Sequence, residues 1–178
     1  MNQKDTENII PNVNSKEKEE RNVPDLRFDN CAWNKLKIKD YYEVQMCKRI
    51  FANQTNLSFG IPFYKIGTLG SKCDSYISYD LFFEYKNKYK FPIKGETLIT
   101  CSGTVGRCVK YDGNDAYYQD SNIVWLRGNN SPITNDFLYI LLSNTDWTKL
   151  NSTTISRIYN SNLYSLQYNY PINIDVQN

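Results

Sequence analysis

The sequence contains no histidine, and this absence excludes several kinds of catalytic site at once. Ser-His-Asp and Cys-His catalysis both need an imidazole as general base, and many zinc enzymes need one as a metal ligand. The glycine-containing turns at 67–70 and 102–106 have neither Walker nor dinucleotide-fingerprint spacing. No two of the six prolines are adjacent, so the Asn-Pro-Pro-aromatic motif of amino-methyltransferases is missing. These absences argue against an enzyme.

Cysteines are few, and their arrangement is uninformative about metals. The five form an odd, scattered set without a Cys-x-x-Cys pair, so structural zinc and a disulfide framework are poorly supported. Reduced thiols in a cytoplasmic protein are the simplest interpretation. The sequence also has no signal-peptide-like segment and no apolar run long enough to cross a bilayer. We therefore expect a cytoplasmic chain that neither enters a membrane nor needs a cofactor.

The net charge of the chain is small, and the composition differs between its first 22 residues and the rest. The formal net charge is +2, and residues 1–22 hold four of the 21 basic and five of the 19 acidic residues. These 22 residues are polar and lack a periodic apolar face, so we expect a flexible tail. From residue 23 onward apolar and aromatic side chains recur. Residues 23–178 should therefore form one domain, whose weak positive charge permits DNA binding without requiring it.

What the sequence has in abundance is tyrosine, with 15 residues, and strand-like segments. Tyrosine suits half-buried strands and polar recognition surfaces alike. Strands are predicted at 61–66, 97–103, 107–111 and 122–126 from β-branched and aromatic runs bounded by glycine turns. A helix should begin after Thr134, with Phe137, Leu138, Leu141 and Leu142 along one face, and a weaker helix is expected at 81–89. The fold class is therefore α+β, strand-rich, with a few helices and long loops.

One enzyme-like pattern remains as an alternative. Pro24-Asp25, followed by Glu84 and Lys86, matches a magnesium-dependent nuclease in which two carboxylates hold the metal and a lysine assists the attacking water. The separation of the two halves is long for such a site. The pattern therefore stands as an alternative to the DNA-binding interpretation developed next.

The most informative stretch runs from Phe91 to Leu126. Two strands flank the small-residue loop 102–106, whose glycines permit positive φ and close approach of the backbone to a ligand. Hydroxyl and backbone N–H groups there can meet phosphate oxygens, and Arg107 follows directly. A second loop, 117–122, gathers amide, hydroxyl and phenol groups of the kinds that read base edges. Both loops could equally be tight turns that satisfy their own backbone.

The candidate DNA contacts fall into two groups. Phosphate contacts are expected from Arg107, Arg157 and Lys65, and base reading from Gln119 and Asn122. Alternatively, Gln119 and Asn122 brace the scaffold while segments 71–79 and 152–157 do the reading. The full set of predicted DNA-binding residues is Lys65, Thr68, Ser102, Thr104, Arg107, Tyr117, Tyr118, Gln119, Ser121, Asn122, Thr154, Ser156 and Arg157.

Ordered blocks along the chain resemble a known family. The blocks follow one another in the order typical of target-recognition domains of type I restriction–modification specificity subunits. They are VPDLRF, Lys48-Arg49-Ile50 with IPFYKIGTLG, the Lys94-Gly95 turn with SGTVG and QDSNI, DFLYILL, and TTISRIYNSNLYSLQYNYP. The resemblance covers about residues 23–178. The closing block departs from the family, because Asn151-Ser152-Thr153 stands where a glycine pair or Gly-Ser/Thr is usual.

The resemblance implies a non-catalytic module that reads one half of a bipartite duplex DNA target. The module would direct a methyltransferase subunit, and through it a restriction subunit, to that site. Family members carry two such domains joined by long helices, so this chain resembles half a subunit or less, and a second half-subunit is a possible partner. A degenerate fragment that binds partner subunits without reading DNA is the remaining alternative.

Overall fold

The computed structural model describes residues 32–150, 157–173 and 177. Strands and short helices are interspersed along these ranges, which confirms the predicted α+β class. The strands are β1 (Trp33–Lys37), β2 (Tyr42–Met46), β3 (Thr55–Asn56), β4 (Ile61–Tyr64), β5 (Tyr76–Ile77), β6 (Thr97–Thr100), β7 (Cys108–Lys110), β8 (Tyr117–Tyr118), β9 (Ile123–Gly128) and β10 (Gln167–Pro171). The helices are α1 (Ile38–Tyr41), α2 (Tyr79–Lys88), α3 (Asn135–Ser143) and α4 (Asn160–Ser165), with 3-10 turns at Ala52–Gln54 and Trp147–Leu150.

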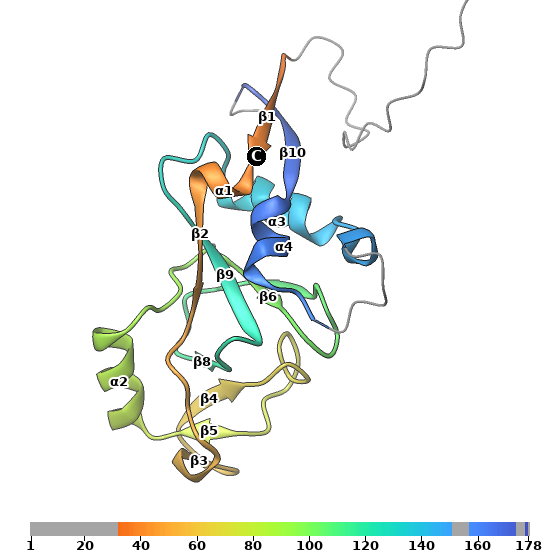
Figure 1. Ribbon diagram of the computed structural model, residues 1–178. Helices are drawn as coiled ribbons and strands as arrows, with labels where there is room; N and C mark the ends of the chain where they lie inside the picture. Colours follow the sequence, from red (N-terminus) through yellow and green to blue (C-terminus); the bar gives the residue numbers. More distant parts are fainter. Residues whose placement is uncertain (1–31, 151–156, 174–176, 178) are drawn as a thin grey trace, which may run out of the picture.

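The strands form two four-stranded sheets and one two-stranded ribbon (Figure 1). The main sheet has the order β2-β9-β6-β7 and is antiparallel throughout. The smaller sheet has the order β3-β5-β4-β8, and its β4–β8 pair is parallel. The ribbon pairs β1 with β10, from Trp33 opposite Pro171 to Lys37 opposite Gln167. Segments far apart in sequence therefore hold each sheet together.

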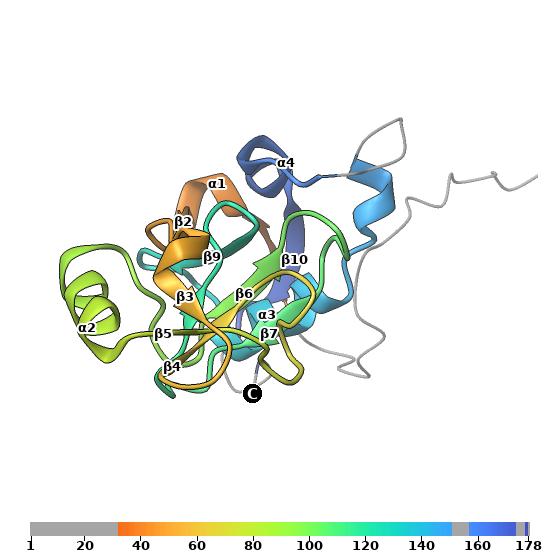
Figure 2. The ribbon, with the colours of Figure 1, turned by 90° about the horizontal axis from the view of Figure 1, so that it is seen from below.

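The main sheet is buried on both faces. Along β9, Val124 and Leu126 belong to one hydrophobic cluster, whereas Ile123 and Trp125 belong to a second. The first cluster includes residues of α3, α4 and the β1–β10 ribbon, and the second includes residues of α2 and the smaller sheet. Successive side chains of a strand point to opposite faces, so a continuous apolar strand serves both clusters. Figure 2 shows α2 and the smaller sheet at some distance from α4.

The two predicted helices are present. Thr134 precedes α3 and its hydroxyl accepts a hydrogen bond from the backbone N–H of Phe137, as the prediction of a capped helix requires. The predicted apolar face of α3 is buried. The weaker helix begins at Tyr79, two residues earlier than predicted, because the Ser78 hydroxyl accepts from the N–H of Leu81 and caps it.

The four predicted strands are present, three of them shorter than predicted and one longer. β6 ends at Thr100, because the backbone N–H of Gly106 donates to the Thr100 carbonyl at 2.8 Å and turns the chain. β9 continues to Gly128, two residues beyond the prediction. β1, β2 and the two-residue strands β3, β5 and β8 were not predicted.

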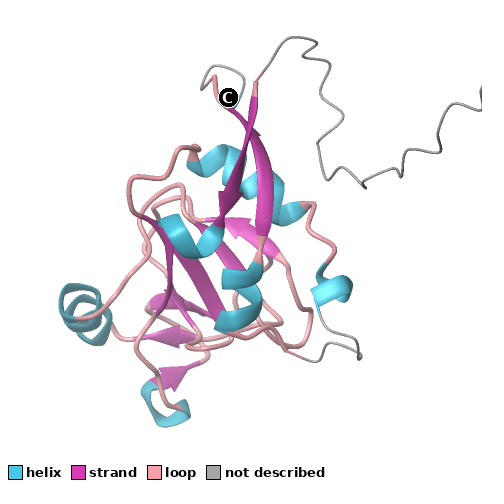
Figure 3. Ribbon diagram, turned by 45° about the horizontal axis from the view of Figure 1, so that its top comes forward, coloured by secondary structure: helices cyan, strands magenta, loops and turns pink. Residues whose placement is uncertain are grey.

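The β1–β10 ribbon projects from the body of the domain and pairs its first strand with its last (Figure 3). Gln177 ties the chain beyond β10 back to α3. Its side chain is buried, accepts from the N–H of Thr134 at 2.9 Å and donates to the carbonyl of Pro171 at 3.0 Å. The predicted tail, residues 1–22, lies outside the described residues. Among the helices of the described ranges, none has the length and apolar character needed to cross a membrane.

Candidate nucleic-acid interface

Three of the predicted loops meet at one end of the main sheet. The Arg107 guanidinium donates to the carbonyl of Leu69 at 3.0 Å, which joins the loop after β6 to the loop after β4. The Gln119 amide oxygen accepts from the N–H of Ile66 at 3.3 Å, which joins the loop before β9 to the same turn. Candidate residues from 65–71, 102–107 and 119–122 therefore lie together.

The turn after β4 is held by Thr68. Its hydroxyl oxygen accepts from the backbone N–H of Lys65 at 3.0 Å, and the Lys65 ammonium pairs with Asp74 at 3.0 Å. Both charged groups of that pair are substantially exposed. Thr68 thus shapes the turn, while the Lys65 charge is partly neutralised before any phosphate arrives.

The loop after β6 is compact, and its glycines have the predicted positive φ. Gly103 has φ +66° and Gly106 has φ +79°. A Cβ atom on Gly106 would lie 2.1 Å from the Trp147 ring, so no larger residue fits. The Thr100 hydroxyl accepts from the N–H of Arg107 at 3.0 Å and donates to the carbonyl of Thr104. Thr104 itself is exposed at the outer side of the loop.

Arg157 closes the cluster from the far end of the chain. It forms an isolated β-bridge with Ser102, and its guanidinium donates to the carbonyl of Ser121 at 3.2 Å. The neighbouring Ile158 N–H donates to Cys101 O at 2.7 Å. Thr154 and Ser156, also predicted to contact DNA, lie outside the described residues.

Tyr117 and Tyr118 require a correction. They form β8 beside β4 and are only 0% and 4% exposed, so in this structure they are core residues without a face for DNA. Burial raises the pKa of both phenols far above the ordinary value. The Tyr117 hydroxyl donates to the carbonyl of Lys48 at 2.9 Å, and Tyr118 stacks on Tyr64. The expectation of an exposed loop was wrong because a parallel pairing with a distant strand buries both rings.

The two amides of the second loop each use their carbonyl oxygen within the protein. Gln119 accepts from Ile66, and Asn122 accepts from the Ser102 hydroxyl at 2.9 Å. Bidentate reading of adenine needs both the carbonyl and the NH₂ group of an amide. Of the two roles that the sequence leaves open for Gln119 and Asn122, these bonds favour the brace. Ser121, between them, has φ +48°, an uncommon value outside glycine.

Sequence reasoning missed Arg49 as a contributor to this region. Its guanidinium pairs with Asp120 at 2.8 Å and keeps more than half of its side-chain surface exposed. Lys48-Arg49-Ile50 stood out as a block shared with the family but carried no signal of a partner 71 positions away. Only the pairing of β4 with β8, which positions the Asp120 loop, makes the contact evident.

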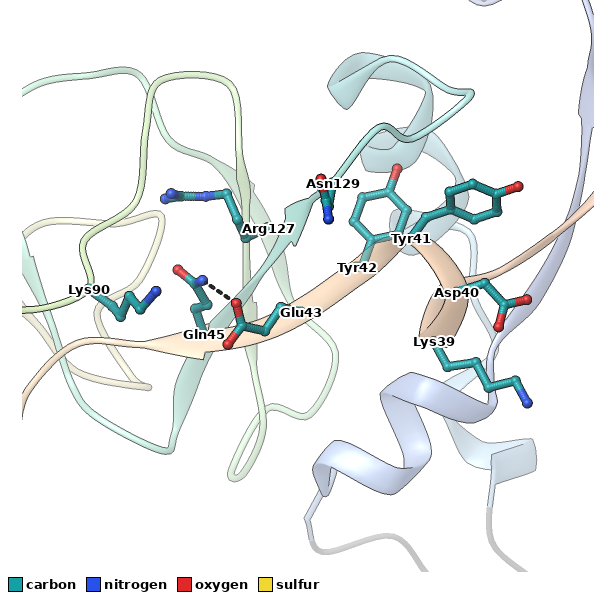
Figure 4. A pocket seen from close by; sticks show the side chains of 10 residues that line it. Lys39, Asp40, Tyr41, Tyr42, Glu43, Gln45, Lys90, Arg127 and Asn129 are labelled. Carbon is teal, nitrogen blue, oxygen red and sulfur yellow. Dashed lines mark hydrogen bonds between the residues drawn. The ribbon is translucent and has the colours of Figure 1, made fainter.

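A polar hollow of about 500 Å³ lies elsewhere, along β2 and the end of β9 (Figure 4). Figure 4 shows Gln45, Lys90 and Arg127 on one side of it and Lys39 with Asp40 on the other. Gln45 donates from its amide to Glu43 at 2.8 Å. None of the predicted DNA-binding residues lines this hollow.

Within the described residues, the structure shows no metal site formed by the residues of the nuclease alternative. Asp25 lies outside the described residues, and Lys86 on α2 pairs with Asp115 at 2.8 Å. In the parts of the chain that the structure describes, no three Cys, Asp or Glu side chains gather as metal ligands. The four described cysteines are free thiols, and burial raises the pKa of Cys47 to about 12.

Comparison with known proteins identifies the family. The family described as "Type I restriction modification DNA specificity domain" matches residues 30–178. A protein of Haemophilus influenzae named as a type I restriction enzyme specificity subunit is 48% identical over 136 residues, which are 76% of this chain and 35% of that protein. The chain thus spans about a third of this relative's length.

Solved structures show the same fold. The S subunit of a type I restriction–modification system from M. genitalium matches 87% of this chain and 39% of its own, with TM-score 0.64 and 18% identity. A chain from a study of complex assembly and conformational transition of the type I system matches 86% and 36%, with TM-score 0.58 and 16% identity. The HsdS subunit from Thermoanaerobacter tengcongensis matches 85% and 36%, with TM-score 0.52 and 17% identity. The chain therefore belongs to the family of type I restriction–modification DNA specificity domains.

Proposed function

We propose that this domain reads one half of a bipartite duplex DNA target and directs type I methyltransferase and restriction subunits to it. The observation that carries the proposal is the convergence of the turns at 65–71, 102–107 and 119–122 with Arg157 on one end of the main sheet. A rigid cluster of hydroxyl and guanidinium groups on a family member of this kind suits contact with a phosphate backbone.

Arg107 and Arg157 are the proposed phosphate contacts. Each donates one guanidinium N–H to a backbone carbonyl, which fixes its position. A guanidinium has five N–H donors, so each arginine keeps several for an anion. Lys65 is a weaker candidate because Asp74 already pairs with it. Ser102, Thr104 and Thr68 line the same loops, and base reading falls to the exposed part of segment 71–79 and to segment 152–157.

The domain itself supplies recognition and no chemistry in this proposal. Methyl donor, nucleotide and Mg²⁺ would belong to partner subunits, and the structure from a study of type I complex assembly supports only that such systems form complexes. A cytoplasmic location accords with the free thiols. Residues 1–22 would be a dispensable tail, and residues 23–178 the recognition domain, with a second half-subunit supplying the other half-site.

A half-site library tests the proposal. The full chain, alone and with a type I methyltransferase subunit, is incubated with randomised duplexes, and retained sequences are determined at several salt concentrations. We expect a defined base preference. Arg107→Ala and Arg157→Ala should each weaken binding to all sequences and reduce the salt slope by about one. Lys35→Ala, an exposed lysine on the ribbon, is the matched control.

Two results would count against the proposal. Equal retention of all sequences, with association to the methyltransferase intact, would identify a fragment that binds partners without reading DNA. Mg²⁺-dependent cleavage that disappears in Glu84→Ala with Lys86→Ala would establish a nuclease instead.

A further inference from the structure

The loop from Phe51 to Gly60 presents apolar side chains to solvent. Leu57 and Phe59, exposed by 83% and 69%, are the two most exposed large hydrophobic residues in the described part of the chain, and Phe51 is 59% exposed. Burying such side chains away from water would be favourable, so their exposure marks a surface suited to a partner. Figure 1 shows this loop, around β3, at the end of the domain opposite the β1–β10 ribbon.

The apolar tip, defined as Leu57 to Phe59, is held in place by its own polar neighbour. The Asn56 side-chain oxygen accepts from the backbone N–H of Ser58 at 3.1 Å and of Phe59 at 3.0 Å. Gly60 follows with φ +112°, and a Cβ there would lie 2.2 Å from the carbonyl of Ile77. The conformation of the tip is therefore fixed by the Asn56 hydrogen bonds and by the close approach of Gly60 to Ile77.

The stem of the loop is equally ordered by side chains. The Gln54 amide oxygen accepts from the N–H of Phe51 at 2.9 Å, and the Thr55 hydroxyl donates to Ala52 O at 2.8 Å. The polar side chains of Gln54, Thr55 and Asn56 thus form hydrogen bonds within the loop. What remains for a partner at the tip is chiefly apolar surface.

The loop is continuous with the candidate nucleic-acid interface. Immediately before Phe51, the Lys48 carbonyl accepts from the Tyr117 hydroxyl at 2.9 Å, and Arg49 pairs with Asp120 at 2.8 Å. Tyr117 lies in β8, and Asp120 follows Gln119 in the loop that braces the proposed DNA contacts. A duplex lying on that interface would therefore lie beside the stem of the apolar tip.

The surrounding charge is that of a DNA-facing segment. Residues 44–73 contain four basic residues, Lys48, Arg49, Lys65 and Lys72, and no acidic residue, although the whole chain has 19 acidic residues. Asp120 and Asp74, which lie outside the segment, partly neutralise Arg49 and Lys65, but the segment still carries a net positive charge that attracts the phosphate backbone. The apolar side chains of this segment would then be held against DNA. The apolar surfaces of DNA are the faces of its stacked bases.

We propose that Leu57 and Phe59 form a wedge that inserts between adjacent base pairs of bound duplex DNA. This rests on the proposed function and deepens it, because energy spent on unstacking depends on the step and contributes to sequence preference. A wedge uses one or two side chains, as this tip has, whereas a stable protein–protein interface needs about 20–30 residues on each side. Duplex DNA therefore fits the tip better than a protein does.

Fluorescence of 2-aminopurine in the duplex tests the wedge, since unstacking raises its emission. The full chain is titrated into duplexes of the preferred half-site that carry 2-aminopurine at successive positions. We expect a rise at one step with the native chain. Leu57→Ala with Phe59→Ala should remove that rise and weaken affinity about tenfold or more, in line with lost apolar burial. Ile140→Ala, an exposed apolar residue on α3, should change neither.

The outcomes distinguish failure of the wedge proposal from failure of the proposed function. If the native chain binds no duplex, the proposed function fails and the wedge fails with it. If it binds selectively but the double variant keeps its affinity, or no position brightens, the wedge is overturned and the proposed function stands. A double variant that binds DNA normally but no longer joins the methyltransferase subunit overturns it too, in favour of a protein partner. Equal melting temperatures of the variants exclude loss of folding.

Discussion

One face of the main sheet packs against mostly aliphatic side chains from α3, α4 and the ribbon, whereas the other packs against rings from α2 and the smaller sheet. The ring pairs found among the described residues all lie on the second side, including Phe63 with Tyr117 and Tyr111 with Tyr118. Each ring buries a large area, so a few of them can stabilise strands of only two residues. The turn at 65–71 packs on this aromatic side through Leu69, whereas the 102–107 loop packs on the other side through Val105.

Tyrosine adds something that an aliphatic cluster cannot provide. The Tyr117 and Tyr111 hydroxyls donate to backbone carbonyls of Lys48 and Asn114, so each ring fills the core and ties down a loop at once. On the first side, Tyr42 and Tyr168 use their hydroxyls in the same way, toward the hydroxyls of Ser131 and Thr145. The two sides thus differ in their ring packing, and the comparison teaches that the tyrosine richness of the chain serves the order of loops more than direct contact with a ligand.

Removing one phenylalanine from each side should produce the largest effects. Phe137→Ala on α3 and Phe82→Ala on α2 delete side chains that are 2% and 0% exposed, and each should lower the free energy of unfolding by about 3–5 kcal/mol. Both variants should still unfold in one transition, because β6 and β9 serve both clusters. Urea unfolding followed by far-ultraviolet circular dichroism and by tryptophan fluorescence measures this. Non-coincident curves would mean that the two sides are separate folding units.

The strand that both sides share depends on a buried carboxylate. Glu96, 2% exposed, precedes β6, pairs with Arg127 and accepts from the N–H of Ile93 at 2.7 Å. Glu96→Ala leaves a partly buried guanidinium unpaired and should cost about 3 kcal/mol, measured by the same urea unfolding. Asp115→Ala, which breaks the exposed pair with Lys86, should cost no more than about 1 kcal/mol. Similar losses in the two variants would contradict a special role for Glu96.

Buried thiols on both sides should produce a smaller effect, confined to alkaline pH. Burial raises the pKa of Cys47 to about 12, of Cys101 to about 11 and of Cys108 to about 12. Unfolded thiols ionise near pH 8.5, so their contribution to stability is complete below that pH and declines as pH rises toward the folded values. We expect the free energy of unfolding to decrease from about pH 9 upward.

A triple Cys→Ala variant is the control for this pH dependence, because burial also raises the pKa of several tyrosines. The variant should decline less steeply with pH than the native chain. Thiol labelling at pH 8 in a Cys31→Ser background gives a second measurement. Half-buried Cys73 should react first, and rapid labelling of Cys47 in the folded chain would contradict its burial.

The sequence predicted elements whose signal is local and failed where pairing is distant. The cap at Thr134 and the apolar face of α3 were predictable, and so was an apolar run in β9. Strands of two residues are too short to show a period, and nothing local tells β1 that its partner is β10. Tyr117 and Tyr118 follow a polar turn and resemble loop residues until β4 buries them.

The candidate site shows the same division. Sequence located the loops, and the glycine φ values at 103 and 106 are as predicted. The sequence did not show which side chains form hydrogen bonds between loops, because that depends on which loops lie together in the fold. The Ser102–Asn122 bond, the Arg157–Ser121 bond and the Arg49–Asp120 pair join residues 20 to 71 positions apart. Which side chains brace the loops therefore depends on contacts between segments that are distant in the sequence.

The smallest expected effect concerns Gln119, whose two roles differ in which atom matters. As a brace it needs only its side-chain oxygen, which accepts from the N–H of Ile66. Gln119→Ala should therefore lower the free energy of unfolding by about 1 kcal/mol and leave base preference unchanged. Gln119→Glu keeps an acceptor and removes the NH₂ donor, so it should keep more of the stability and the same rank order of half-sites, with a uniform loss of affinity from the added charge. Library selection and thermal melts measure both. A changed rank order in Gln119→Glu, at native stability, would identify the NH₂ group as a base reader and shift recognition toward the braced loop.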